Sequence, residues 1–344
     1  MNLFQSIKNH ISMHPARQES FFSMIQGLWL FQSVHLRQLA YGMAGAASLD
    51  SKIRRLQRFF QHQDLDYVAI GKLILSLFNL STPLTLTLDR TDWMYGKAPI
   101  NILVLGVLIG DMSVPIAFSL LNKKGNSNTM ERAFLIKVLL KIIPTSRIDC
   151  LLADREFIGK DWFRLLIKQG IPFAIRIKSS TKMKDPRTGK MTTVGQYYRS
   201  VRRGDYVIET QIWEQNTYLM FKKQGKSLPN AVFLAVSTKD IRTSWIKKYR
   251  KRWSIERMFL SLKTHGFNLE QTHLTKPDRL RKLIAVMAIA FAVCCRIGKF
   301  LNEIIPIPIK THGRRLYSIF TYGLIRIKEQ LSKPMNYNSF LREM

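Results

Sequence analysis

The stretch from Leu84 to Leu121 reads LTLTLDRTDWMYGKAPINILVLGVLIGDMSVPIAFSLL, and it decides the fold class. It holds three apolar runs rich in Leu, Ile, Val and Thr, separated by turn residues such as Gly96 and Gly110. Short runs of this kind between turn signals predict a three-stranded antiparallel meander. The three predicted strands are Leu84–Asp89, Ile100–Gly110 and Val114–Leu121.

Helical patterns then alternate with apolar strands. We expect helices at Thr129–Ile143 and Lys160–Gln169, each followed by a strand, at Ser146–Ala153 and Pro172–Ile177. The resulting order, β-β-β-α-β-α-β, is typical of a mixed sheet with helical crossovers. The sequence therefore predicts an α/β protein with a ribonuclease-H-like core.

The flanking regions have other patterns. Residues 1–82 are predicted to be helical, for example at Ser20–Leu36 and Ser51–Phe60, and basic residues in and beside these helices favour a DNA-binding region. A plain helical cap on the core is the alternative. The expected organisation is a helical DNA-binding region at 1–82, the first part of the core at 83–178, a β-rich insertion at 179–240, a catalytic helix at 241–266 and a helical C-terminal region at 267–344.

Charge indicates the partner. The 344 residues include 54 Lys and Arg but only 23 Asp and Glu, a formal net charge of +31. Such a chain repels itself unless a polyanion neutralises it, and phosphate contacts supply most non-specific affinity for nucleic acids. The expected partner is therefore nucleic acid.

The cysteines and the apolar segments indicate the cellular compartment of the protein. Cys150, Cys294 and Cys295 form no disulfide framework and no metal-ligand spacing, which suits a reducing cytosol. Residues Met1–Gln18 have no signal-peptide pattern, and the apolar run Leu283–Cys295 is short for a bilayer. We expect a soluble protein without a membrane partner, in which this run is a buried helix.

Two carboxylates end apolar strands. Asp89 ends the first predicted strand and Asp154 ends the fourth. Burying an ionised acid costs several kcal/mol unless it is paired or binds a metal. A turn or helix-cap role is the alternative for either residue alone. Because these two strands are expected to be neighbours, the two acids should face each other.

A third acid lies in the segment YRKRWSIERMFLSLK, residues 249–263. On one helix, Tyr249, Arg252, Glu256 and Lys263 would share a face, and the four together could follow a long polyanion with Glu256 at the reaction point. A solvated face with weak ion pairs is the alternative.

Three converging carboxylates would need cations between them. All-oxygen ligands suit Mg²⁺ or Mn²⁺, and two such ions could assist displacement at phosphorus. Asp89, Asp154 and Glu256 are therefore the candidate metal ligands. The nearby acids Asp92 and Glu156 are interpreted as supporting or salt-bridging residues.

These blocks resemble the DDE-type insertion-sequence transposases, and specifically the insertion-sequence-four branch. The branch signature, Tyr-x2-Arg-x3-Glu-x6-Lys, is matched by Tyr249, Arg252, Glu256 and Lys263. The segments around Asp89 and Asp154 also look like the blocks around the family's first and second acids. The resemblance spans about residues 84–265 and leaves room for a β-rich insertion before the third acid.

The resemblance implies a cut-and-paste DNA transposase, located in the bacterial cytoplasm and associated with the nucleoid. It would cleave transposon ends by metal-activated water and join the freed 3′-hydroxyl to target DNA, using two divalent ions and acting as a homodimer on DNA. Tyr249, Arg252 and Lys263 would hold phosphates of the terminal inverted repeats. Trp213 or Trp253 could stack a flipped base, although a tryptophan is more often a packing residue.

Two other functions stay open at this point. One is a nuclease on the same core that cuts without strand transfer. The other is a DNA-binding repressor derived from a transposase, which the presence of all three acids argues against.

Overall fold

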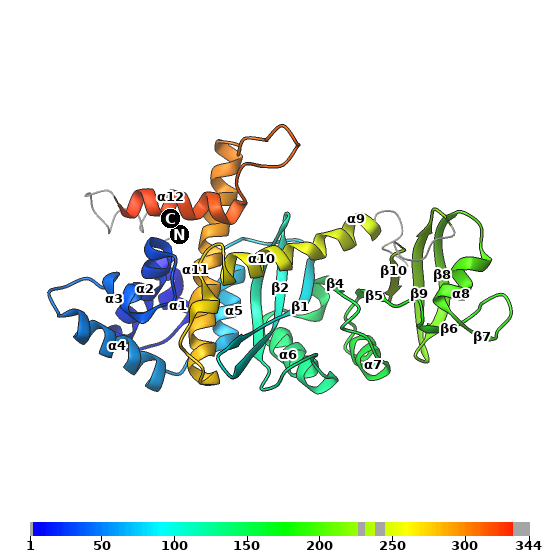
Figure 1. The fold of residues 1–344 in the computed structure, drawn as a ribbon, viewed down its shortest axis with the longest axis horizontal. Helices are drawn as coiled ribbons and strands as arrows, with labels where there is room; N and C mark the ends of the chain where they lie inside the picture. Colours follow the sequence, from blue (N-terminus) through cyan, green and yellow to red (C-terminus); the bar gives the residue numbers. More distant parts are fainter. Residues whose placement is uncertain (1–2, 226–230, 238–244, 333–344) are drawn as a thin grey trace.

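The computed structural model describes residues 3–225, 231–237 and 245–332. Its centre is one ten-stranded mixed sheet with the strand order β3-β2-β1-β4-β5-β10-β9-β8-β6-β7, and helices flank it (Figure 1). The predicted α/β fold is confirmed, and it is consistent with a ribonuclease-H-like transposase core. The strands are β1 (Leu84–Tyr95), β2 (Ala98–Ile109), β3 (Met112–Leu120), β4 (Ile148–Ala153), β5 (Phe173–Ile177), β6 (Lys182–Lys184), β7 (Met191–Thr193), β8 (Gly204–Ile212), β9 (Gln215–Lys223) and β10 (Phe233–Val236).

The helices lie before, between and after these strands. Five precede the sheet, three connect strands, and the remaining α-helices follow β10. They are α1 (Leu3–His10), α2 (Pro15–Phe31), α3 (Leu36–Tyr41), α4 (Leu49–His62), α5 (Tyr67–Ser76), α6 (Thr129–Ile142), α7 (Lys160–Lys168), α8 (Val194–Ser200), α9 (Trp245–Arg250), α10 (Ser254–Lys263), α11 (Pro277–Ile304) and α12 (Ile319–Leu331). The described residues also include the short 3₁₀ turns η1 (Thr145–Arg147), η3 (Lys251–Trp253) and η4 (Leu269–Gln271).

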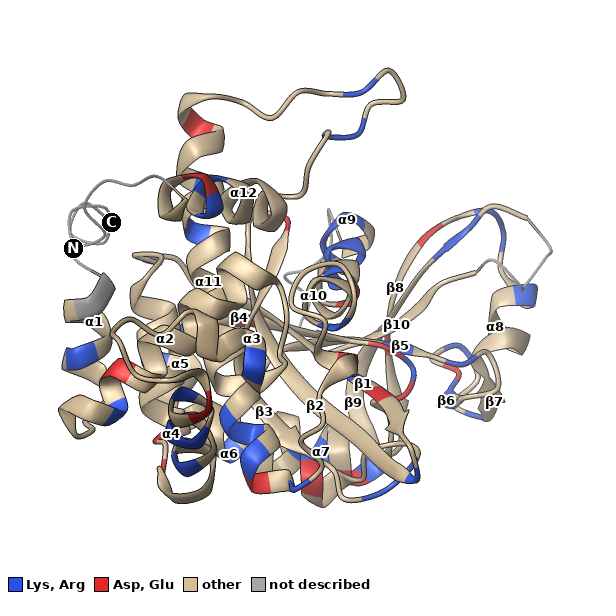
Figure 2. Ribbon diagram, turned by 60° about the vertical axis from the view of Figure 1, so that its left-hand side comes forward, with Lys and Arg blue, Asp and Glu red and all other residues tan. Residues whose placement is uncertain are grey.

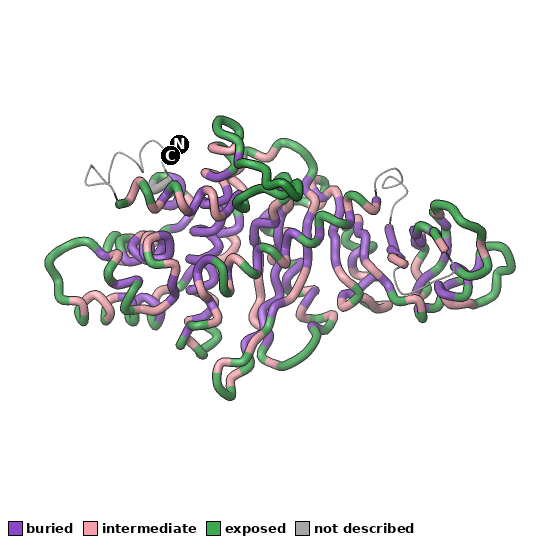
Figure 3. Tube along the Cα trace, turned by 45° about the horizontal axis from the view of Figure 1, so that its top comes forward, coloured by how far each residue is buried: buried purple, intermediate pink, exposed green. Residues whose placement is uncertain are grey.

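Strand β4 shows why this sheet forms. Its residues are almost all apolar, as expected for a strand covered on both faces. Cys150 and Leu152 belong to a small cluster with Trp245 and Tyr249, whereas Leu151 belongs to the large core on the opposite face. The strand pairs in parallel with both β1 and β5. Figure 3 shows the central strands mostly buried and the outer loops exposed.

Helix α11 joins the N-terminal helices to the sheet. The Trp29 indole nitrogen of α2 donates to the Ala290 carbonyl, 3.2 Å away, and the Lys282 ammonium lies 3.0 Å from the Phe60 carbonyl of α4. Helix α11 is long and apolar enough to cross a membrane, but 78% of its most apolar window is buried inside the protein. The expected buried helix around Leu283–Cys295 is confirmed.

Helices α11 and α12 cross with their backbones in close approach. A Cβ atom added to Gly298 would lie 1.9 Å from the Ile319 carbonyl oxygen, and one added to Gly323 would lie 1.9 Å from that of Cys294. Only glycine fits at both positions. This crossing fixes where α12 begins. The loop of residues 305–318, which connects the two helices, projects from the body of the protein (Figure 1).

Several sequence-based boundaries were wrong. The predicted helix Ser20–Leu36 ends early, at Phe31 of α2, because Gln32 takes a left-handed conformation with φ 51°, and the next helix, α3, begins only at Leu36. The first strand does not end at Asp89 but continues to Tyr95, paired with β2 throughout.

The strands of the predicted β-rich insertion at 179–240 extend the core sheet. Strand β10 pairs antiparallel with both β5 and β9, so the sheet continues without a break into β8 and β6. The expected boundary between residues 240 and 241 lies outside the described residues.

Candidate active site

Asp89 and Asp154 lie on neighbouring strands. Strand β1 pairs in parallel with β4, and the last aligned pair is Leu88 with Ala153. Asp154 directly follows β4, whereas Asp89 lies within β1, at the point where β1 runs past the end of β4. The two acids are therefore next to each other because of the parallel register, although Asp89 is not at a strand tip.

Glu256 reaches the same place from an interrupted helix. The segment predicted as one helix is α9, the 3₁₀ turn η3 and α10 in succession. A 3₁₀ turn has about three residues per turn, so Tyr249, Arg252 and Glu256 do not follow the regular helical spacing assumed from the sequence. Arg252 lies in the turn itself.

The Arg252 guanidinium lies between two of the acids. Its Nη1 is 3.3 Å from Asp89 Oδ2, and its Nη2 is 2.8 Å from Glu256 Oε1. The Arg252 side chain is only 5% exposed. Burial disfavours its charge, but the charges of Tyr249, Asp154, Asp89 and Glu256 outweigh burial and raise the pKa of Arg252. The three acids therefore converge on one buried cation.

The pKa of Asp89 is perturbed. Burial raises its pKa from 3.8 to about 6, and repulsion from Glu256 and Asp154 acts in the same direction. The Arg90 amide, which donates to Asp89 Oδ1 at 2.8 Å, and the charge of Arg252 oppose this rise. One guanidinium thus compensates the negative charge of the cluster only in part.

The donor set fits a hard divalent cation. All the donors are carboxylate oxygens, which Mg²⁺ and Mn²⁺ prefer. Asp154 Oδ1 is buried and has no hydrogen-bond partner within the described residues, an unusual cost for a polar atom. As the described side chains stand, no three Asp, Glu, His or Cys groups are close enough to hold one ion. The Arg252 guanidinium supplies the positive charge instead.

The other two signature residues lie on either side of this cluster. The Tyr249 hydroxyl donates to the Ala153 carbonyl at 3.3 Å, directly before Asp154, and burial raises the pKa of Tyr249. The Lys263 ammonium lies 2.7 Å from Glu270 and 5.3 Å from the centre of the Trp93 ring. The structure therefore places Tyr249 and Arg252 beside the acids. Lys263 of α10 lies next to Trp93, farther along β1 than Asp89.

Asp92 and Glu156 form ion pairs, as predicted. The Arg90 guanidinium lies 3.0 Å from Asp92 Oδ1 and 2.9 Å from Glu156 Oε1. Arg90 is the residue directly after Asp89, and Glu156 is two residues after Asp154. The ion pair between Arg90 and Glu156 therefore links the backbone segments beside the two acids. The role of Arg90 was not predicted from the sequence.

Arg132 of α6 was also missed. It is 4% exposed, and it donates to the carbonyls of Ser127 at 2.6 Å and Glu156 at 3.1 Å. Its guanidinium also lies 5.0 Å from the centre of the Phe157 ring. Arg132 thereby holds the loop that follows Asp154. A signal was present, because Arg132 falls on the same helical stripe as Leu135, Ile136 and Leu139.

A cationic cavity of about 570 Å³ opens beside the acids. Basic side chains from the sheet and from the α9–η3 segment line it, with no acid among its described lining residues, and Figure 2 shows basic positions on α9 near α10. Trp253 lines this cavity and is 60% exposed, whereas Trp213 packs edge-on against Phe163 at 5.0 Å. The cationic lining residues are Arg176, Lys222, Arg250 and Arg252.

Comparisons with known proteins bear on this arrangement. The Transposase DDE domain profile matches residues 100–293, more than half of the chain, including Asp154 and Glu256 but beginning after Asp89. No curated protein shows significant sequence similarity. The solved structure of endonuclease V from Bacillus subtilis is similar at 14% identity, over 66% of this chain and 93% of that one, with a TM-score of 0.26, which is too low to bear on function. The chain belongs to the family of transposases with a DDE domain.

Proposed function

We propose that the protein is a cut-and-paste DNA transposase of the insertion-sequence-four branch, with Asp89, Asp154 and Glu256 as ligands of two divalent cations. Transposases of this family act on DNA and generally use divalent metal ions. The observation that carries the proposal is the convergence of three carboxylates, from β1, from the end of β4 and from α10, on one buried guanidinium.

The reaction consists of two displacements at phosphorus. In the first, a water oxygen bonds to phosphorus and the P–O3′ bond at the transposon end breaks, which leaves a 3′-hydroxyl. In the second, that 3′ oxygen loses its proton, bonds to a phosphorus of the target strand and displaces the target's own 3′ oxygen. Bound divalent cations would activate the attacking oxygen and stabilise the leaving oxygen.

Arg252 has two roles in this proposal. Without ligands it neutralises Asp89 and Glu256, which would otherwise repel each other. If the carboxylates held cations, the Arg252 guanidinium would be free to bind a DNA phosphate with two parallel hydrogen bonds. Because Arg252 also lines the cationic cavity, a short movement would be enough to exchange carboxylate for phosphate.

The remaining residues orient these groups. Tyr249 fixes the backbone before Asp154, and its ring lines the same cavity, where it can contact the DNA. Lys263 is a point charge for a phosphate farther along the strand. Trp253, rather than Trp213, is suited to stack an unpaired base, because its ring is exposed at the cavity. The partners would be the terminal inverted repeats and target DNA, held by a homodimer.

The test is cleavage and joining with Glu256→Gln. We expect this variant to bind a duplex carrying the element's ends like the wild type but to lose Mg²⁺-dependent cleavage. Glu303→Gln is the matched control, since Glu303 is exposed on α11 and pairs only with Lys299 among the described residues. Cleavage by Glu256→Gln at the wild-type rate would refute the assignment.

The same assay separates a transposase from a nuclease. Duplexes that already end in the 3′-hydroxyl are supplied with a target plasmid, so that cleavage is not needed. A transposase joins them, whereas a nuclease without strand transfer gives no joined product. A repressor would bind the ends and do neither.

A further inference from the structure

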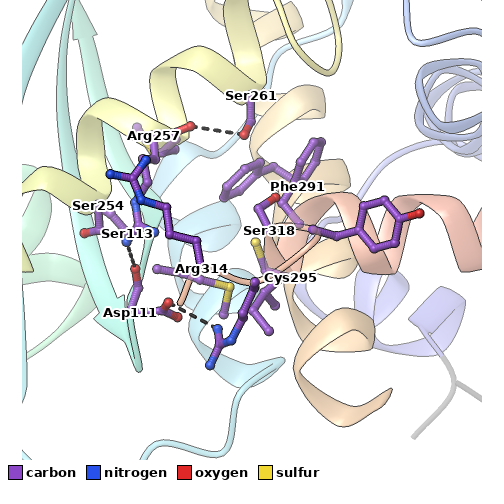
Figure 4. Close-up of a pocket in the computed structure, with 15 residues that line it drawn as sticks. Asp111, Ser113, Ser254, Arg257, Ser261, Phe291, Cys295, Arg314 and Ser318 are labelled. Atoms are coloured by element: carbon purple, nitrogen blue, oxygen red, sulfur yellow. Dashed lines mark hydrogen bonds and ion pairs between the residues drawn. The ribbon is translucent and has the colours of Figure 1, made fainter. Parts of the chain in front are cut away.

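A second cavity lies on another side of α10, away from the acids. Its volume is about 370 Å³, and it is enclosed by α10, α11, the β2–β3 turn and the loop that leads into α12 (Figure 4). Phe291, Cys295 and Phe320 contribute apolar surface to it. The proposed function uses none of its lining residues.

The rim of this cavity is strongly basic. Arg257 of α10 and Arg314 and Arg315 of the 305–318 loop line it, against one carboxylate, that of Asp111. Arg315 pairs with Asp111 Oδ2 at 3.2 Å, and Arg257 donates to the Asp111 carbonyl at 2.6 Å. The Arg314 side chain has no hydrogen-bond or ion-pair partner within the described part of the chain. Figure 4 shows Arg257 and Arg314 on the side of the cavity that lies next to α10.

Three serine hydroxyl groups lie in the lining, and two of them are already bonded: Ser261 Oγ donates to the Arg257 carbonyl at 3.1 Å, and Ser318 Oγ lies 2.8 Å from Thr321 Oγ1. Ser254, Ser261 and Ser318 all line the cavity. Ser254 is 2% exposed, and its Oγ has no partner among the residues that the structure describes. A buried hydroxyl without a partner is costly, and a bound acceptor would remove that cost. Basic groups, a free hydroxyl donor and an apolar floor together suit a phosphate attached to a less polar body.

We propose that this cavity binds a phosphate group of the DNA backbone, with its sugar against the apolar floor. The inference rests on the proposed function, because it gives the DNA a second anchoring point on the helix that carries Glu256. Glu256 and Arg257 are adjacent in sequence, so a strand held by Arg257 and Arg314 would be fixed relative to the reacting phosphate. Fully cationic arginines are the residues best suited to bind a phosphate in this way.

The experiment measures binding of an end duplex by the full-length protein over a range of salt concentrations. The variants are Arg314→Gln and Ser254→Ala, with Arg326→Gln as the charge-matched control, since Arg326 is exposed on α12 and pairs with Glu329 away from the cavity. We expect Arg314→Gln to bind about 3- to 10-fold more weakly, with the slope of log affinity against log salt smaller by about one. Ser254→Ala should weaken binding without changing the slope.

Two results would overturn the inference. One is equal affinity and slope for Arg314→Gln and Arg326→Gln. The other is stabilisation of the wild type by inorganic phosphate, lost in Arg314→Gln, without any effect of that variant on DNA binding, because the cavity would then serve a free anion. Wild-type cleavage is measured on the same preparation, so that failure of the proposed function, seen as no cleavage, is distinguished from failure of the cavity alone.

Discussion

Glu256 and Arg257 are adjacent on α10, yet they belong to clusters of opposite charge. Around Glu256, the Arg252 guanidinium pairs with Asp89 and Glu256, and the charge of Asp154 also acts on it. Around Arg257, three guanidiniums line a cavity with one carboxylate, that of Asp111, which pairs with Arg315. Each cluster is left with excess charge of one sign, and in each of them one buried oxygen has no hydrogen-bond partner among the described residues, Asp154 Oδ1 in the first and Ser254 Oγ in the second.

The difference shows what each cluster lacks. The acidic cluster would be completed by cations and the basic cluster by phosphates, and a metal-dependent reaction on DNA supplies both. In the acidic cluster the Arg252 and Asp89 side chains are 5% and 17% exposed and that of Glu256 is 37% exposed, so unpaired charge on Asp89 is the most costly to the folded protein. The basic cluster is partly exposed and solvent screens it, so its excess charge affects binding more than stability.

The largest expected effect is on catalysis by the acidic cluster. Asp154→Asn should lower the rate of end cleavage by a factor on the order of 10³, because a lost metal ligand removes several kcal/mol of transition-state stabilisation. Single-turnover cleavage with saturating DNA is the measurement. Arg314→Gln should cleave near the wild-type rate once DNA is saturating. Equal losses in both variants would contradict the division between the clusters.

Removing the Arg252 guanidinium from the acidic cluster should lower the free energy of unfolding. Arg252→Met leaves Asp89 and Glu256 without their partner, and breaking a buried pair typically costs about 3–5 kcal/mol. Chemical denaturation in EDTA measures this loss, and added Mn²⁺ should restore more stability to the variant than to the wild type. Arg315→Met in the basic cluster is the control, with an expected loss of under about 1 kcal/mol. If Arg252→Met unfolds at the same denaturant concentration as the wild type, the role given to Arg252 is refuted.

The raised pKa of Asp89 predicts a pH dependence. The folded state favours the protonated carboxyl, with a pKa of about 6 against 3.8 for the ordinary group. Its contribution to stability is therefore full below about pH 4 and is lost as the pH rises through about 6, a change of about 3 kcal/mol. Without divalent ions, the wild type should lose stability relative to Asp89→Asn across this window. A difference between the two that does not vary with pH would exclude the effect.

The smallest effect is expected from removing the acid of the basic cluster. Asp111→Asn frees Arg315 and adds one positive charge to the cavity rim, so end binding at low salt should tighten about 2- to 5-fold. Stability should change by less than about 1 kcal/mol, because the pair is exposed. Fluorescence anisotropy of a labelled duplex measures the affinity. Weaker binding would mean that Asp111 holds Arg315 in its binding position.

Much of the acidic cluster could be predicted from the sequence, because it depends on strand order. The alternation of apolar runs and helices placed the first and fourth strands side by side, and the parallel register of β1 and β4 then brings Asp89 next to Asp154. The position of Glu256 followed from its signature spacing. The 3₁₀ turn at residues 251–253 could not be predicted, because helical periodicity does not distinguish a tight turn inside a helical segment.

The basic cluster could not be predicted from the sequence, for a different reason. Arg257, Arg314 and Asp111 lie far apart in the sequence, and their meeting depends on where α12 crosses α11 at Gly298 and Gly323. A close helix crossing between two glycines gives no periodic signal. The pairing of Arg90 with Glu156 was missed for a similar reason, because the two residues lie on different segments, whereas Arg132 had a signal in its place on the apolar stripe of α6.

The contact between Trp29 and Ala290 spans 261 positions of the chain, and it has a consequence for synthesis. Helices α2 and α4 leave the ribosome long before α11, the helix on which they pack. At translation rates of about 5–20 residues per second, many seconds pass before α11 can emerge and close the N-terminal core. Truncation before residue 277 would therefore leave those helices without their packing partner, however complete the three acids were.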